Sequence, residues 1–337
     1  MAYAAGDTIT AALYNVLVSN SSSPYGYNHF AGEGSGEYGL GQTELATVAG
    51  NDNKTTITAA QWNALMTGII NIANHTNDSI TARTQVTAGD SIAIKSALEA
   101  DLATLAASVA GGCTSATALD TSSAKRTSSA AGAWKVHHTV EHSITFANAN
   151  TMRYFFNGGG KIRVLGDRTG SGLAGDGGSE SNVKQDDWTT LLAAVGNLDI
   201  GSQASTRSGS GETVSTNGLA NGFHDLGTGY TVILKLSSDN STHSGTGSNY
   251  TNNYIEVSAK LNASVGSSTV MTVKYDLRDG AGDQTFTSGN TSSIDSEVDR
   301  VGVTRVRLYI LSPNDEQGLA ADITESATAE VSNAKDS

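Results

Sequence analysis

The segment HHTVEHSITF, residues 137–146, has a residue spacing that is typical of zinc chemistry. His138, Glu141 and His142 match the H-x-x-E-H pattern of the inverted zincins, in which two histidines bind zinc and the glutamate activates water. The pattern requires an α-helix, because only there do residues four apart lie one turn apart on the same face. The secondary structure of this segment therefore decides whether the sequence predicts a metalloenzyme.

The residues around the motif alternate as they do in a β-strand. One register holds apolar residues together with His138 and His142, and the other register holds polar residues and Glu141. Four residues of a strand span roughly 13 Å, too far for two nitrogens that must each lie about 2 Å from one zinc ion. Glu141 would also point away from both histidines. We therefore predict a strand, no enzyme, and no catalytic, cofactor-binding or metal-binding residues.

Three further segments resemble binding sites, and each has an ordinary structural interpretation. GGGK at residues 158–161 lacks the Ser or Thr and the glycine spacing of a phosphate-binding loop, so we expect a turn. DLRDGAGD at residues 276–283 could hold calcium through its aspartates, but its spacing misses the EF-hand pattern and favours a loop. The aromatic residues of RYFFN, 153–157, could form a sugar-binding patch, although in a strand at least one of them must face the core.

Composition narrows the classes of partner. The 337 residues carry a net charge of −13, which argues against a nucleic-acid backbone, since that contact needs a basic surface. No run reaches the roughly 20 apolar residues of a membrane span, and the single cysteine, Cys113, excludes an internal disulfide framework. The N-terminal segment MAYAAGDTITAALYN contains no Lys or Arg, so we expect no secretory signal and synthesis in a cytoplasm. The 38 glycines favour a turn-rich β protein.

The first third of the chain contains an internal repeat. Residues 8–17 read TITAALYNVL and residues 56–65 read TITAAQWNAL, and seven of the ten positions are identical. A weaker third copy, GDSIAIKSAL, begins at Gly89 and is similar to the GDTIT that begins at Gly6. The repeat predicts three related elements between residues 1 and 110.

The shared residues of the repeat are typical of a helix N-terminus. Thr58 is a natural N-cap and Gln61 follows three residues later, which makes a capping box. Ile57 before the cap and Trp62 at the fourth helical position form a hydrophobic staple. The first copy repeats this arrangement with Ile9, Thr10 and Tyr14.

Each predicted helix has an apolar stripe at helical spacing. The stripes permit two interpretations: a small helical domain that packs its own stripes, or helices that dock onto another protein or onto copies of themselves, since three short helices make a thin core. On the second interpretation the region 1–110 serves attachment or oligomerisation. Its candidate assembly contacts are then Ile9, Tyr14, Ile57, Trp62, Leu65, Ile69, Leu98, Leu102 and Leu105.

The remainder of the chain predicts a linker and a β domain. Residues 111–133 are almost all small and polar and indicate a linker. From 134 to 337 the period changes to two, for example at 255–261, 271–277 and 305–310. We expect a hairpin with an Asn-Gly turn at 152–165 and one helix at 186–196. The predicted fold class is α+β, mainly β: short N-terminal helices followed by an antiparallel β-sandwich.

Several of these stretches together resemble a known family. GDTITA at 6–11, FANANTMRYFFNGGGKIRV at 146–164, WTTLL at 188–192 and GFHDLGTGYTVI at 222–233 are similar to structural proteins in the virions of tailed bacteriophages, including marine myoviruses. The resemblance extends from Gly6 to about Tyr309. Two departures are Ala93, where a threonine would cap the third helix, and an insertion at 237–252.

The resemblance implies a virion structural protein without catalytic residues or a cofactor. We expect a tail-associated component (fibre, neck or baseplate-peripheral) that is assembled in the host cytoplasm and acts by assembly. The expected partners are other virion proteins and further copies of the chain, with a trimer as the first hypothesis, and neither nucleic acid nor a membrane. The alternatives are a carbohydrate-binding adhesin that uses the 237–252 loop and a capsid decoration protein. An enzyme, either a zinc peptidase or a depolymerase, ranks last.

Overall fold

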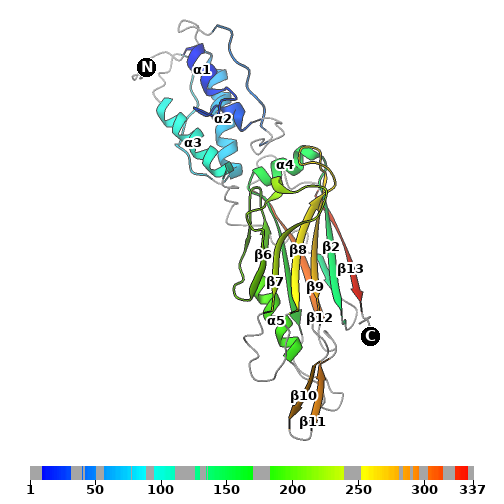
Figure 1. The fold of residues 1–337 in the computed structure, drawn as a ribbon. Coiled ribbons are helices and arrows are strands. Elements are labelled where there is room, and N and C mark those ends of the chain that lie inside the picture. Colours follow the sequence, from blue (N-terminus) through cyan, green and yellow to red (C-terminus); the bar gives the residue numbers. More distant parts are fainter. Residues whose placement is uncertain are drawn as a thin grey trace.

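The computed structural model describes residues 10–31, 40, 42–50, 57–76, 78–88, 95–110, 126–129, 134, 136–169, 183–238, 252–280, 284–288, 291–295, 303–313 and 323–332. Its buried apolar side chains form two separate clusters, one within residues 13–109 and one within residues 134–310. We call the first part the helical unit and the second the sandwich. Figure 1 shows the helical unit beyond one end of the sandwich.

The helical unit contains three α-helices and a short 3-10 helix. The helices are α1 (Ala11–Leu17), α2 (Ala59–Thr76) and α3 (Lys95–Ala110), and the 3-10 helix η1 spans Tyr27–His29. The predicted capping box is confirmed: Thr58 N donates to Gln61 Oε1 at 2.9 Å, and Gln61 N donates to Thr58 Oγ1 at 3.2 Å. Thr10 caps α1 with its side chain, because Thr10 Oγ1 accepts from Leu13 N at 3.4 Å, but the leucine side chain cannot return a bond as Gln61 does. The start of the third copy, residues 89–94, lies outside the described residues.

The sandwich consists of two antiparallel sheets. The five-stranded sheet has the order β1 (Arg126–Ser129), β12 (Val303–Leu311), β3 (Lys161–Thr169), β4 (Leu198–Ile200), β5 (Ser205–Arg207). The six-stranded sheet has the order β13 (Thr324–Ser332), β2 (His137–Thr145), β9 (Val270–Arg278), β8 (Tyr254–Leu261), β7 (Thr231–Ser237), β6 (Thr213–Asn217). A separate hairpin pairs β10 (Gln284–Ser288) with β11 (Thr291–Asp295). The predicted mainly β, antiparallel α+β sandwich is confirmed, as are the strands expected at 255–261, 271–277 and 305–310.

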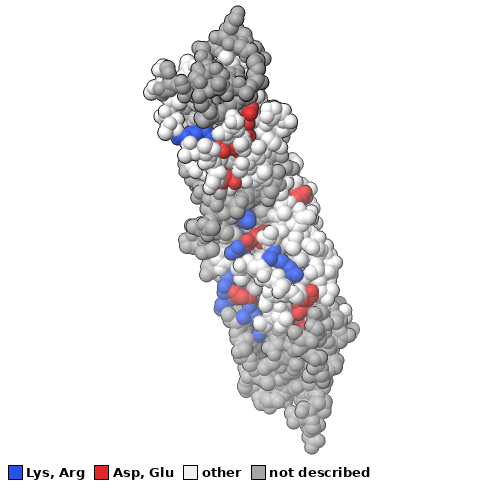
Figure 2. Space-filling view, turned by 90° about the vertical axis from the view of Figure 1, so that its left-hand side faces the viewer, with Lys and Arg blue, Asp and Glu red and all other residues white. Residues whose placement is uncertain are grey.

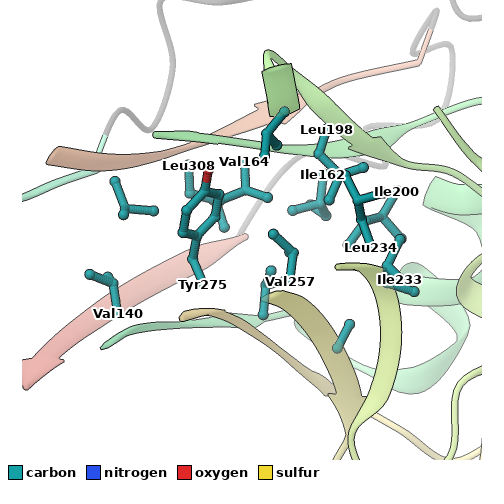
Figure 3. Close-up of a cluster of buried hydrophobic side chains, with 14 of the residues drawn as sticks. Val140, Ile162, Val164, Leu198, Ile200, Ile233, Leu234, Val257, Tyr275 and Leu308 are labelled. Atoms are coloured by element: carbon teal, nitrogen blue, oxygen red, sulfur yellow. The ribbon is translucent and has the colours of Figure 1, made fainter. Parts of the chain in front are cut away.

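The core lies between the two sheets. Figure 3 shows Val140, Val257 and Tyr275 of the six-stranded sheet facing Val164 and Leu308 of the five-stranded sheet. All five side chains are fully buried. The alternation of each strand therefore buries one face and leaves the polar face outside.

Helix α5 (Val183–Val195) completes this core and confirms the helix expected at 186–196. It packs mainly on β3 and also contacts β7 and β8. Gly166 of β3 allows this close approach, because a Cβ atom there would lie 2.4 Å from Leu192 and 2.9 Å from the Tyr275 hydroxyl. Trp188 of α5 stacks edge-on against Trp134, with ring centroids 5.0 Å apart.

The hairpin expected at 152–165 is wrong in its first half. Residues 149–157 form helix α4 (Ala149–Asn157), and only the second half is a strand, β3. Asn148 caps the helix by accepting a hydrogen bond from Thr151 N at 2.9 Å. Met152, Phe155 and Phe156 then lie on one helical face in the core. The Asn-Gly pair ends a helix here and does not connect two strands.

Part of the expected linker is also a strand. Residues 126–129 form β1 and pair with β12, for example Ser128 with Val306. The remaining residues of the 111–133 segment lie outside the described residues. The sandwich therefore begins before residue 134, and the boundary predicted from the sequence is corrected to include β1.

Candidate functional site

The candidate assembly contacts of the sequence form the core of the helical unit. Of the nine residues, Ile57 is partly buried against this core and Ile9 lies outside the described residues. The other seven are at most 1% exposed and belong to one cluster: Tyr14, Trp62, Leu65, Ile69, Leu98, Leu102 and Leu105. The stripes therefore pack on one another, as in the first interpretation, and a contact of this unit with a partner has to use other side chains.

Two extended segments hold the helices of this unit together. We call residues 42–48 the first strap and residues 78–87 the second strap. Asn15 of α1 binds the first strap with both ends of its amide: Nδ2 donates to Val48 O at 3.0 Å, and Oδ1 accepts from Val48 N at 2.8 Å. Asn63 of α2 binds Val86 of the second strap in the same way, with both distances 2.9 Å. The identical asparagine of the repeat therefore satisfies a strap backbone that pairs with no strand among the described residues.

A third asparagine makes the same contact outside the repeat. Asn28 of η1 donates to Leu45 O and accepts from Leu45 N, both at 2.9 Å. In all three cases the asparagine follows an aromatic residue that is buried in the core of the unit, namely Tyr14, Tyr27 or Trp62. The recurrent aromatic–Asn pair is visible in the sequence, but the hydrogen bonding of its asparagine to a strap backbone was not predicted. We call each of these two-bond contacts between an asparagine amide and a strap residue an asparagine bracket.

The second strap is held from the opposite side by α3. Asp101 accepts hydrogen bonds from Thr81 N and Thr81 Oγ1, each at 3.3 Å, and forms an ion pair with Arg83. The strap thus links α2 to α3 through charged and neutral contacts. The unit is a packed body with its own core and polar brackets, which makes it a candidate attachment module.

The zinc-like motif lies on a strand, as predicted. His138 and His142 of β2 are fully buried and face the interior of the sandwich. Glu141 lies on the opposite face, where it accepts a hydrogen bond from Tyr230 Oη at 2.7 Å. Among the described residues no group of three or more His, Cys, Asp or Glu side chains is placed to hold a metal ion. Burial lowers the pKa of His142 to about 4, so this imidazole is neutral near pH 7.

The outer face of the six-stranded sheet carries a network of polar groups. Lys260 Nζ and Lys274 Nζ lie 4.3 and 4.5 Å from the ring centroid of Tyr230, and Lys235 Nζ lies 3.7 Å from that of Tyr254. Burial, followed by the hydrogen bond to Glu141, raises the pKa of Tyr230. Figure 2, which views the molecule from the side on which β6 lies in Figure 1, shows positive and negative side chains interspersed on that side. Lysine ammonium groups therefore lie over the rings of Tyr230 and Tyr254, so neither ring is a bare platform for a sugar.

The other apparent sites also have structural roles. The rings of Phe155 and Phe156 are fully buried and Tyr154 is 8% exposed, so the aromatic residues of RYFFN do not form a surface sugar patch. The loop expected at 276–283 is wrong for its first three residues, which end strand β9, and there Asp276 accepts from Thr139 Oγ1 at 2.6 Å and from Arg278 Nε at 2.8 Å. Asp283 and residues 239–251 of the insertion lie outside the described residues.

Comparisons with known proteins identify no relative. No protein-family model, no curated protein and no solved structure matches this chain. Within the part of the chain that the structure describes, no helix has both the length and the apolar character needed to cross a membrane.

Proposed function

We propose that the chain is a non-enzymatic structural protein of a tailed-bacteriophage virion, in a tail-associated position, which acts by assembly. The observation that carries this proposal is the division into two separately packed bodies, each with its own apolar core. A body with its own core can bind to a particle while the other projects from it. The resemblance of the GDTITA and RYFFN-GG stretches to virion proteins supports the same function. A host-surface adhesin and a capsid decoration protein remain the alternatives.

The helical unit is the proposed attachment module. Residues 1–110 contain nine acidic and three basic residues, so this part of the chain has a net charge of −6. Two large apolar side chains of its described helices are exposed, Val16 of α1 at 44% and Ile70 of α2 at 37%. Exposed apolar side chains on a unit of negative net charge favour a partner surface that offers apolar pockets and basic residues. The proposed partners are further copies of the chain and other virion proteins, and the oligomeric mass of the chain tests the first of these.

Substitution of the exposed apolar residues tests the attachment role. The double variant Val16→Asp/Ile70→Asp leaves the buried core intact, so the chain should fold while its oligomeric mass, measured by light scattering, decreases. Val214→Asp is the matched control, because Val214 is equally exposed, at 41%, but lies on edge strand β6 of the sandwich. If the mass changes only in the control variant, the assembly surface lies on the sandwich and not on the helical unit.

A further inference from the structure

Arg153, the first residue of RYFFN, is a buried cation that forms no ion pair in the part of the chain that the structure describes. It lies on α4 and only 1% of its surface is exposed. Its Nε and Nη2 atoms are both buried and have no acceptor among the described residues. An unpaired charge buried in this way is strongly destabilising, so proteins retain one where a counterion or a functional partner compensates it.

The two unpaired nitrogens define the shape of the missing partner. Nε and Nη2 lie on the same edge of a guanidinium group and point two N–H bonds in parallel, which matches two oxygens of one anion. Arg163 of β3 shows the filled arrangement in the same protein: its Nε and Nη2 donate to the two carboxylate oxygens of Asp199 at 2.6 and 2.8 Å. Arg153 presents the same edge, and no described carboxylate pairs with it.

The groups around Arg153 do not neutralise it. The ring of Tyr154 lies with its centroid 5.0 Å from Arg153 Cζ, which is a cation–π contact. His224 Nε2 lies 2.8 Å from Asn157 Oδ1, so the last residue of RYFFN orients this imidazole. Burial, together with the charge of Arg153, lowers the pKa of His224 to about 4, partly offset by Asp225. Asp225 itself is exposed and accepts from Gly222 N at 2.8 Å, which caps η2 (Phe223–Asp225).

We propose that Arg153 binds an oxyanion through Nε and Nη2, and that α4 and η2 form this anion site at the end of the sandwich. The ligand presents two oxygens to one edge of the guanidinium, as phosphate, sulfate and carboxylate do and as chloride does not. The site gives a role to both ends of RYFFN, because Arg153 supplies the charge and Asn157 fixes the neutral histidine beside it. Figure 1 shows α4 at the end of the sandwich that lies nearer to the helical unit.

Thermal unfolding of the full chain in different salts tests this site. We expect the Tm of the sandwich to be a few degrees higher in phosphate than in chloride at equal ionic strength, because an anion that binds only the folded state stabilises it. In acetate a similar increase would indicate a planar carboxylate ligand, and an increase in phosphate alone would indicate a tetrahedral one. Arg153→Met should raise the Tm in chloride, since it removes an uncompensated charge, and should abolish the difference between the salts.

Arg163→Met is the matched control, because it removes an arginine whose Nε and Nη2 already donate to the carboxylate of Asp199. This variant should lower the Tm in every salt and keep the phosphate effect. A second measurement needs no variant: the His224 imidazole pKa, followed by NMR, should rise when phosphate binds beside it. The proposal is overturned if the wild-type chain shows no oxyanion-specific change in either Tm or the His224 pKa, or if the Tm effect persists in Arg153→Met.

Discussion

The helical unit and the sandwich satisfy the hydrogen bonds of their extended backbone in different ways. In the helical unit, Asn15, Asn28 and Asn63 are neutral and bind the backbone of a strap with both ends of the amide. In the sandwich the strand backbones pair in ladders, and ionisable groups such as Arg153 and His142 lie in the interior. A strap pairs with no neighbouring strand among the described residues, so its backbone depends on single side chains. The comparison predicts that deletion of one of these amides destabilises the helical unit, and that protonation of the buried His142 destabilises the sandwich.

The largest expected effect is the loss of stability when a buried tryptophan is removed from one of the two cores. Trp62→Ala should destabilise the helical unit and Trp188→Ala the sandwich, each by about 3–5 kcal/mol, because each removes a fully buried indole. Differential scanning calorimetry of the full chain should show two unfolding transitions, with one variant affecting each. A single transition that both variants lower equally would mean that the two units unfold as one.

The next effect is a loss of stability of the sandwich in acid. Burial lowers the pKa of His142 from the ordinary histidine value of 6.5, which applies in the unfolded chain, to about 4 in the folded chain, so the unfolded state binds the proton first. Stability is therefore fully present above pH 6.5 and falls as the pH decreases towards 4, by about 3 kcal/mol for this group. His224 acts in the same direction, because burial lowers its pKa as well.

Urea unfolding at several pH values measures this dependence. His142→Leu should flatten the curve over that range and stabilise the sandwich, since it replaces a buried imidazole whose nitrogens have no acceptor or donor among the described residues. His137→Gln, on the opposite face of β2, is the control and should keep the acid dependence. An unchanged acid dependence in His142→Leu would contradict the account.

The brackets of the helical unit give a smaller effect. Asn63→Ala removes both bonds to Val86 and should destabilise this unit by about 1–3 kcal/mol, because the strap backbone loses its partners. Asn71→Ala is the control, since the Asn71 amide bonds only to the Gln42 side chain, at 3.2 Å, among the contacts described for it. Hydrogen exchange should show faster exchange of the Val86 amide in Asn63→Ala alone. Equal effects of the two variants would mean that the bracket does not hold the strap.

The smallest effect belongs to the outer face of the six-stranded sheet. Lys235 pairs with Glu256 at 3.3 Å and both side chains remain partly exposed. Lys235→Ala should cost less than about 1 kcal/mol, and the cost should shrink further in high salt. Chemical denaturation at two salt concentrations measures it. A larger, salt-independent loss would indicate that the ring of Tyr254, which Lys235 also contacts, depends on this side chain for its packing.

The elements with one strong local signal were predicted from the sequence. The alternation around Val140 placed β2 correctly and removed the zinc interpretation of His138 and His142, since a strand turns Glu141 to the other face. The capping box of Thr58 and Gln61 located the start of α2. Both signals depend on residues within one turn or one strand, where spacing alone determines geometry.

The failures occurred where two local signals competed or where the partner is distant in sequence. In the stretch 149–157 the β preference of Tyr154, Phe155 and Phe156 concealed a helical stripe that the Asn148 cap makes possible. The strand β1 pairs with β12, which lies far away in the sequence, and no residue pattern within 126–129 predicts a strand. The same applies to the Asn brackets and to Arg153, because their roles depend on which groups the fold brings next to them.

The most direct test of the proposed function is the oligomeric mass of the full chain, compared with that of a chain that begins at residue 111 and so retains β1. Light scattering measures both masses, and circular dichroism confirms that the shortened chain keeps its strands. The account predicts an oligomer for the full chain and a monomer for the shortened one, because the helical unit makes the assembly contact. An oligomer of the same order for both chains would contradict it and would assign assembly to the sandwich.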